Sequence, residues 1–175
     1  VLRKIYEGRD NSLLATALYG MGNDILVMGK QEEGLRSMTE GIRMMIRKSN
    51  GYDQTSTQFA WYLANEYLVL DMPDSAIRYF QESIIANSSE FSDSDPLKNP
   101  KIEHANSTYF QFRAMNGKVT AYRAKYEERK DIQWLKAAYQ NALAADSSIS
   151  TLREKLILLK NQFWMSQKVS QTLGQ

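Results

Sequence analysis

The sequence predicts an all-α chain, built as a right-handed superhelical stack of antiparallel helix hairpins. Three observations lead to this prediction. Only 3 prolines and 9 glycines interrupt the 175 residues. Most stretches between them repeat apolar residues at intervals of three and four, which places those residues on one face of an α-helix. Matched pairs of such helices also recur in one register, which is typical of repeat architectures. We therefore expect a single helical domain over residues 1–175.

The first hairpin is expected over about residues 12–49. Ser12 is a candidate N-cap for its first helix, and Gly29 with Lys30 is expected to end that helix. The second helix is expected to stop near Asn50 and Gly51. The apolar positions of the two helices are Leu14, Leu18, Met21, Ile25 and Met28, then Leu35, Met38, Ile42, Met45 and Ile46. Residues 1–8 resemble the end of a preceding helix.

The second hairpin is expected over about residues 53–88. Asp53 or Thr55 is a candidate N-cap, and Pro73 suits the first turn of the second helix, where a missing backbone N–H is harmless. The apolar positions are Phe59, Tyr62, Leu63, Tyr67 and Leu70, then Ala76, Ile77, Phe80 and Ile84. Ser, Asp, Asn and Pro residues then crowd together and predict a loop over 88–106. A loop of this length is either functional or mobile, and we favour a mobile one.

The third hairpin is expected over about residues 107–146, with a break at Lys130 and Asp131. Ser147 is a candidate cap for a separate terminal helix over 147–172. That helix carries a heptad seam, spaced three, four, three and four, at Ile149, Leu152, Leu156, Leu159 and Phe163. It either caps the open end of the stack or packs against another chain. We favour a capping helix, because the end of a helical stack exposes apolar surface.

The three expected hairpins share one register. Their first helices contain Met21, Gly22 and Ile25; Leu63, Ala64 and Tyr67; and Tyr122, Arg123 and Tyr126. Their second helices contain Gly34, Met38 and Gly41; Ala76, Phe80 and Ser83; and Leu135, Tyr139 and Ala142. Gly22 to Met38, Ala64 to Phe80 and Arg123 to Tyr139 each span 16 residues. Small side chains let two helix axes approach closely, while the large residue fills the space toward the next pair.

This pattern resembles the tetratricopeptide repeat (TPR), whose signature is large-small-x-x-aromatic followed by small-x-x-x-aromatic-x-x-small. The second hairpin matches it best. The third departs from it at Arg123 and Leu135, where the pattern requires small residues, so we expect its helices to splay. Equivalent positions are 42 and then 59 residues apart (34 to 76, 76 to 135), against a usual period of about 34, so both junctions are lengthened.

A narrower resemblance covers about a third of the chain, from Phe91 to Arg153. The residues that carry it are, in order, Phe91, Asp95, Asn99, Pro100, Gly117, Lys118, Tyr122, Tyr126, Lys130, Asp131, Leu135, Ala137, Ala138, Tyr139, Ala142, Asp146, Leu152 and Arg153. They resemble the TPR region before the peptidase domain of bacterial CHAT proteins, a caspase-related family. A related resemblance is to the TPR sensor segment of bacterial signalling proteins, where an Asp-Ser sequence such as Asp146 and Ser147 leads into a long connecting helix.

The CHAT resemblance implies a regulatory arm and not a catalytic domain. That family uses a Cys and His pair, whereas this chain has no Cys and one His. The effector domain of the same parent chain would then lie outside this sequence. We expect this chain not to be an enzyme.

The composition narrows the possible partners. The chain has 22 Lys and Arg against 20 Asp and Glu, a formal charge of +2 that argues against a wide nucleic-acid surface. Its apolar runs are too short to span a membrane, which needs about 20 residues. The absence of Cys excludes disulfides, thiolate metal sites and a Cys nucleophile from this segment. No cofactor or metal is expected. The chain is expected to be cytoplasmic, with the periplasm as the alternative.

The face lined by the first helices of the hairpins is the expected binding groove. The TPR pattern places Tyr19, Asn23, Trp61, Tyr62, Asn65 and Leu68 on it. Asn23 and Asn65 are equivalent, and an amide that both donates and accepts hydrogen bonds suits an extended peptide backbone. TPR domains that bind a C-terminal carboxylate use Lys and Arg here, where this chain has Tyr19, Tyr62, Gly117 and Ala121, so that mode is not expected. The alternative is that these side chains pack against neighbouring helices.

Other candidate sites are weaker. His104 with Glu103 has too few ligands at metal-binding spacing and is expected to be an exposed loop histidine. The pairs Glu32 with Glu33 and Glu127 with Glu128 are expected to be solvated, because acid–base catalysis requires carboxyls in an apolar pocket. Arg43, Arg47 and Lys48 are explained by a helix C-terminus. The sequence therefore predicts a noncatalytic scaffold that binds a protein or peptide.

Overall fold

The computed structural model describes residues 11–48 and 54–173, except for the side chains of residues 11, 46–48 and 164–173. Over this part the chain is helical, apart from its turns, the loop after residue 86 and one isolated bridge between Ser88 and Ala105. The all-α prediction is confirmed. The expectations for residues 1–8, for the stop near Asn50 and Gly51 and for the Asp53 cap lie outside the described residues.

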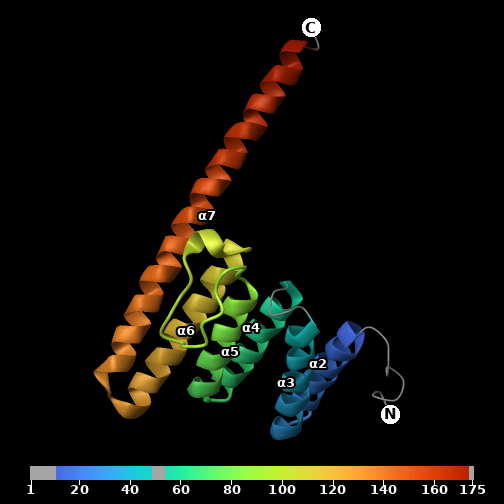
Figure 1. The fold of residues 1–175 in the computed structure, drawn as a ribbon, viewed down its shortest axis with the longest axis vertical. Coiled ribbons are helices and arrows are strands. Elements are labelled where there is room, and N and C mark those ends of the chain that lie inside the picture. The colour runs from blue at the N-terminus through green and yellow to red at the C-terminus, as the bar shows by residue number, and fades with distance from the viewer. Residues whose placement is uncertain (1–10, 49–53, 174–175) are drawn as a thin grey trace.

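In the described part of the chain, six α-helices and one short 3-10 helix follow one another. They are α2 (Asn11–Val27), α3 (Gln31–Lys48), α4 (Gln54–Val69), α5 (Pro73–Ala86), η1 (Ile102–His104), α6 (Thr108–Arg129) and α7 (Ile132–Leu173). Consecutive helices form antiparallel pairs, α2 with α3, α4 with α5 and α6 with α7, and the pairs lie side by side in chain order (Figure 1). Each pair lies in a part of the chain where a hairpin was expected.

The turns between paired helices follow the predicted residues closely. Gly29, with φ +80, follows α2, and Pro73 is the first residue of α5. Lys130 ends α6 in the left-handed region, and its N–H donates to Tyr126 O at 2.7 Å. The predicted caps fit less well, because Ser12 and Thr55 lie inside the first turns of α2 and α4 and not before them.

The first pair is packed through glycines. A Cβ added to Gly22 would lie 2.6 Å from Met38 Cγ and 2.7 Å from Gly34 O. At Gly41 it would lie 2.5 Å from Ala15 O. These distances are too short for any side-chain carbon, so the close approach of α2 and α3 requires Gly at these positions. The predicted role of small residues in this pair is confirmed.

The second pair confirms the predicted placement of Ala64 and Phe80 on adjoining antiparallel helices. Both residues are fully buried, Ala64 on α4 and Phe80 on α5. Ser83 Oγ donates to Thr57 O at 2.8 Å and joins the two helices in the core. The Phe80 ring also lies against Gly117 of α6, where a Cβ would come within 2.2 Å of the ring. The aromatic residue therefore fills the space toward the next pair.

The expected splaying of the third pair is wrong. The Tyr122 ring stacks on Trp134 with centroids 6.0 Å apart, and Ser148 Oγ lies 3.8 Å from Met115 Sδ. These contacts join α6 and α7 from Met115 to Tyr122 of α6. Arg123 and Leu135 are both exposed, so their size does not separate the helices.

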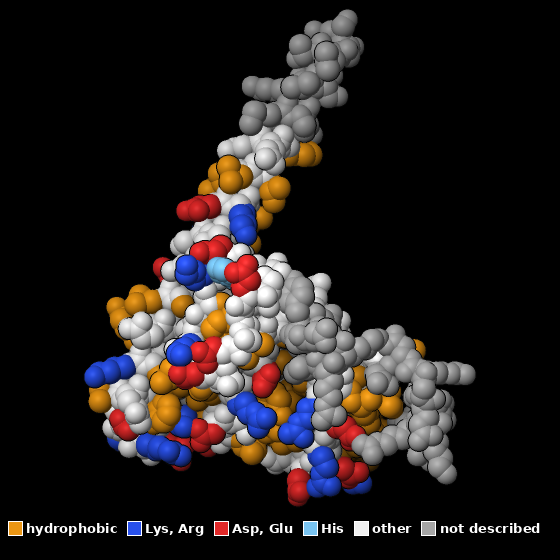
Figure 2. Space-filling model, in the orientation of Figure 1, with side chains coloured by type: hydrophobic (Ala, Val, Ile, Leu, Met, Phe, Trp, Pro, Cys, Tyr) orange, Lys and Arg blue, Asp and Glu red, His pale blue; other side chains and the backbone are white. Residues whose placement is uncertain are grey.

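The separate terminal helix expected over 147–172 is also wrong. α7 is continuous from Ile132 to Leu173, and Ser147 Oγ donates to Leu143 O at 3.1 Å inside it. Its C-terminal part extends beyond the three pairs and does not cap their open end (Figures 1 and 2). No helix in the described part of the chain is long and apolar enough to cross a membrane.

Candidate functional site

The first helices of the three pairs present a surface that we call the aromatic face. It is formed by Tyr19 of α2, Trp61 and Tyr62 of α4, and Tyr109 and Arg113 of α6. Its rings are half-buried or exposed, unlike the fully buried rings of Phe80 and Tyr122 in the core. The surface therefore combines apolar area with polar groups that reach solvent, as binding surfaces do.

The junction between α2 and α4 holds the Tyr19 side of this face. The Tyr19 ring stacks on Phe59 with centroids 4.4 Å apart, which fixes it across the gap between the pairs. Burial raises the pKa of the Tyr19 hydroxyl well above its usual value, and the charges of Glu66 and Tyr62 act in the same direction. Tyr19 is therefore a neutral hydroxyl at physiological pH, able to donate or accept a hydrogen bond.

The junction between α4 and α6 holds the only cation of the aromatic face. The Arg113 guanidinium carbon lies 3.5 Å from the centroid of the Trp61 ring and 5.3 Å from that of Tyr109. The described residues provide Arg113 with neither an ion pair nor a hydrogen bond. Trp61 Nε1 is buried and also lacks a hydrogen-bond partner there. Stacking thus orients a guanidinium whose donors remain available to a ligand.

The predicted groove residues are partly brought together. Trp61 and Tyr62 contact each other edge to face at 5.1 Å, and Tyr62 hydroxyl accepts from Gln58 Nε2 at 3.3 Å. Asn65 lies on the same helix, but its Nδ2 donates to Trp61 O at 2.6 Å, so that donor is used within α4. Asn23 is exposed on α2, and Leu68 is half-buried against the core. The two equivalent asparagines therefore differ: the side-chain donor of Asn65 is used within α4, whereas Asn23 is exposed to solvent.

Arg113 was not among the predicted groove residues, because the repeat register selects other positions of α6. That register equates Arg123 with Ala64, and so places Thr120 beside Trp61. The residue found there is Arg113, two turns nearer the start of the helix. Gly117, expected on the groove, faces the Phe80 ring, and Ala121 is fully buried. The available signal was a single arginine, Arg113, three residues after the aromatic pair Tyr109 and Phe110.

The loop after α5 is anchored, which argues against the expected mobile loop. Gln81 Nε2 donates to the carbonyls of Asp93, Asp95 and Lys98 at 2.7, 3.0 and 3.3 Å. Tyr122 hydroxyl donates to Pro96 O at 2.7 Å. At the start of the loop, Asn87 exchanges hydrogen bonds with Asn106 and Ser107. The loop is thus bonded to α5 and α6 at both ends and in the middle.

Lys118 lies at the centre of this network and is fully buried. Its Nζ donates to Gln81 Oε1 at 2.8 Å and to Asn99 Oδ1 at 3.0 Å. Burial lowers the pKa of Lys118 to about 7, although the charge of Asp95 acts in the opposite direction. A neutral amine has two N–H groups, and both acceptors are present. The network is therefore complete without a charge on Lys118.

A cavity of about 530 Å³ opens on the other side of the first two pairs, between α3 and α5. Its lining mixes apolar and charged side chains and consists of Glu32, Leu35, Arg36, Thr39, Glu40, Arg43, Met44, Tyr67, Met72 and Ser75. Met38 and Met45, by contrast, are buried in the core. The lining carries both signs of charge, so the cavity favours no class of ligand.

The weaker candidates lie in ordinary surroundings. His104 Nδ1 is 2.6 Å from Glu90 Oε2, and the described residues contain no cluster of three side chains suited to a metal. Glu32 pairs with Arg36 at 2.9 Å, and Glu127 pairs with Lys130, in exposed ion pairs. The pKa of Glu127 is lowered by its hydrogen bond to Lys130. These carboxylates are paired at the surface.

Comparison of the chain with protein-family models, with curated proteins and with solved structures returns no match.

Proposed function

We propose that this chain is a noncatalytic scaffold, a TPR-like right-handed stack of helix hairpins, that binds an extended peptide across its aromatic face. The observation that carries the proposal is the Arg113 guanidinium, which lies against Trp61 and Tyr109 and whose donors have no partner among the described residues. Stacked aromatic and Arg side chains in partly buried positions are the usual anchors of protein interfaces.

The chemistry of this face favours a peptide with an acidic side chain next to an apolar one. A carboxylate would accept hydrogen bonds from Arg113 and replace water on a guanidinium that is already oriented. The rings of Tyr19, Trp61 and Tyr62 would cover the neighbouring apolar side chain. Glu66, beside Tyr19, would disfavour a second acidic residue at that end of the face.

Selection from a random 12-residue peptide library, followed by measurement of Kd, tests this proposal. We expect the selected peptides to contain Asp or Glu. Arg113→Gln is expected to weaken binding of a selected peptide about tenfold or more, and Trp61→Ala with Asn65→Ala still more. Arg123→Gln, an exposed arginine on the same helix, is the matched control and should leave Kd unchanged. Equal Kd values for Arg113→Gln and Arg123→Gln would contradict the proposal.

A second candidate function is a regulatory arm of a CHAT-type peptidase or of a TPR-containing bacterial signalling protein. The continuity of α7 through Asp146 and Ser147 supports it, because this is where a long connecting helix is expected in such a sensor segment. Sequencing the gene beyond Gln175 tests it. An open frame leading into an effector domain would support the regulatory arm, and a stop codon directly after Gln175 would contradict it.

A further inference from the structure

The C-terminal part of α7 carries apolar side chains that no other described element covers. Among the described residues, the hydrogen bond nearest the C-terminus that joins α7 to another element runs from Lys155 Nζ to Thr108 Oγ1, at 3.4 Å. From Leu156 to Leu173 the helix extends about 27 Å further, at 1.5 Å per residue. Figure 2 shows hydrophobic side chains along the described portion of this projection. A lone helix of this length is marginal in water, so a partner surface would stabilise it.

The exposed apolar residues contain a coiled-coil seam. Ile149 and Leu152 are half-buried at the edge of the body, and the heptad then continues into solvent with Leu156, Leu159 and Phe163. These three are 56%, 60% and 61% exposed. Residues spaced in this way align along one side of a helix and pack into a second helix. The natural occupant of the seam is therefore an α-helix.

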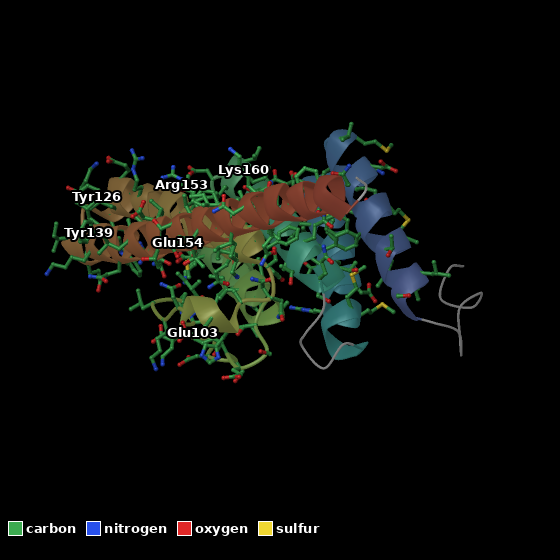
Figure 3. The ribbon with its side chains drawn as sticks, turned by 90° about the horizontal axis from the view of Figure 1, so that it is seen from above. Glu103, Tyr126, Tyr139, Arg153, Glu154 and Lys160 are labelled. Atoms are coloured by element: carbon green, nitrogen blue, oxygen red, sulfur yellow. The ribbon has the colours of Figure 1, made fainter. Side chains whose placement is uncertain are left out.

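The charged side chains that flank the described part of the seam are all cationic. With Ile149 and Leu156 at heptad position a, Arg153 and Lys160 occupy position e and Lys155 occupies position g. Figure 3 shows Arg153 and Lys160 on one side of α7 and Glu154 on the other. Arg153 and Lys160 make no ion pair with any described side chain. Positions e and g are those that contact the flanking residues of a partner helix.

This charge pattern disfavours a second copy of the chain as the occupant. In a parallel pair, Lys155 at g of one helix would face Lys160 at e of the other. In an antiparallel pair, e residues face e residues, which again brings Arg153 and Lys160 against cations. Like charges at these positions are repulsive, and opposite charges are attractive.

We propose that the seam of α7 (Ile149, Leu152, Leu156, Leu159 and Phe163) docks an amphipathic helix of another polypeptide, with acidic residues flanking its apolar stripe. This surface is separate from the aromatic face and does not depend on the peptide-binding proposal. The seam supplies the apolar contact, and Arg153, Lys155 and Lys160 select the partner by charge.

Two synthetic peptides test the proposal against the whole chain. Each has four heptads with Ile at a and Leu at d; one has Glu at every e and g position, and the other has Lys. Fluorescence anisotropy should show the Glu peptide binding about tenfold or more tightly than the Lys peptide. The double variant Arg153→Glu with Lys160→Glu, both exposed residues, should reverse that preference.

A matched pair of variants distinguishes binding at the seam from nonspecific hydrophobic binding. Leu156→Asn with Leu159→Asn should abolish binding of the Glu peptide. Ile157→Asn with Leu158→Asn removes equally exposed residues off the seam and should keep Kd within about threefold. Circular dichroism of all variants checks that helicity is retained.

Three results would overturn the proposal. The first is equal affinity for the Glu and Lys peptides. The second is sedimentation that shows a dimer dissociated by Leu156→Asn with Leu159→Asn, because the occupant would then be a second copy. The third is absence of Glu-peptide binding together with binding to vesicles of phosphatidylglycerol and phosphatidylcholine, because the surface would then be a membrane contact.

Discussion

The α2/α3 pair and the contact of α5, the loop and α6 are held together in opposite ways. In the first, Gly22, Gly34 and Gly41 have no side chain, and this lets the backbones of the two helices come into contact. In the second, Gln81 and Lys118 fill the space with amide and amine groups that bond the loop to the helices. The α2/α3 contact depends on the close fit of two backbones, and the contact of α5, the loop and α6 depends on hydrogen bonds between buried polar groups. The two contacts should therefore respond differently to substitution and to pH.

The largest effect is expected from Gln81→Leu, which breaks the polar contact at its centre. It removes the donor shared by the carbonyls of Asp93, Asp95 and Lys98 and an acceptor of Lys118. Buried polar groups without partners cost about 1–3 kcal/mol each, so we expect a loss of about 3 kcal/mol in the free energy of unfolding, measured with urea. Hydrogen exchange of residues 93–98 should rise. An unchanged unfolding midpoint would show that the loop is not held this way.

Gly22→Ala should break the contact that depends on shape. The added carbon would clash with Gly34 O and with Met38 N, both backbone atoms 2.7 Å away, so the helices must separate. We expect a loss of about 2 kcal/mol by urea unfolding. Gly20→Ala on the same helix meets nothing within 4 Å and should be neutral or stabilising by up to about 1 kcal/mol. Equal effects of the two substitutions would contradict close packing.

The pH dependence of stability sharpens the comparison, because Lys118, at the centre of the polar contact, has a pKa lowered into the neutral range. Lys118 has a pKa of about 7 in the folded chain and 10.5 as its ordinary value. Between these values the unfolded chain binds more protons, so the free energy of unfolding should rise with pH, by about 1 kcal/mol per unit between pH 7 and 9. Urea unfolding at several pH values measures this slope.

Lys118→Met should remove that rise, and Lys136→Met, on the exposed surface of α7, should retain it. A rise of the same size in both variants would assign the slope to another group. Tyr19 and Tyr122 have raised pKa values, so their contribution to stability changes only above about pH 10, outside this range.

The parts of the fold that depend on local spacing could be predicted from the sequence. Gly29, Pro73 and Lys130 mark turns, and the 16-residue register identifies which helices pair. The break at Ser147 was wrong because Ser at a helical position can bond to the carbonyl four residues before it, as Ser147 and Ser148 both do. A serine-rich stretch therefore does not by itself end a helix.

The parts that depend on long-range contacts could not be predicted. Gln81 and Lys118 lie 37 residues apart, and their hydrogen bond joins helices that local spacing does not relate. The lysine looks like an ordinary surface residue in the sequence, yet it is fully buried. Of the predicted site, Trp61 and Tyr62 lie together on the aromatic face. Arg113 was not predicted because the repeat register places Thr120, and not Arg113, at the position equivalent to Trp61.

The most direct test of the proposed function is a double-mutant cycle between Arg113 and an acidic residue of a selected peptide. The cycle combines Arg113→Gln in the chain with Glu→Gln or Asp→Asn in the peptide, and all four Kd values are measured by isothermal titration calorimetry. If the guanidinium binds that carboxylate, the coupling free energy should be about 1–2 kcal/mol. A coupling indistinguishable from zero, with both single changes weakening binding independently, would contradict recognition of the peptide by Arg113.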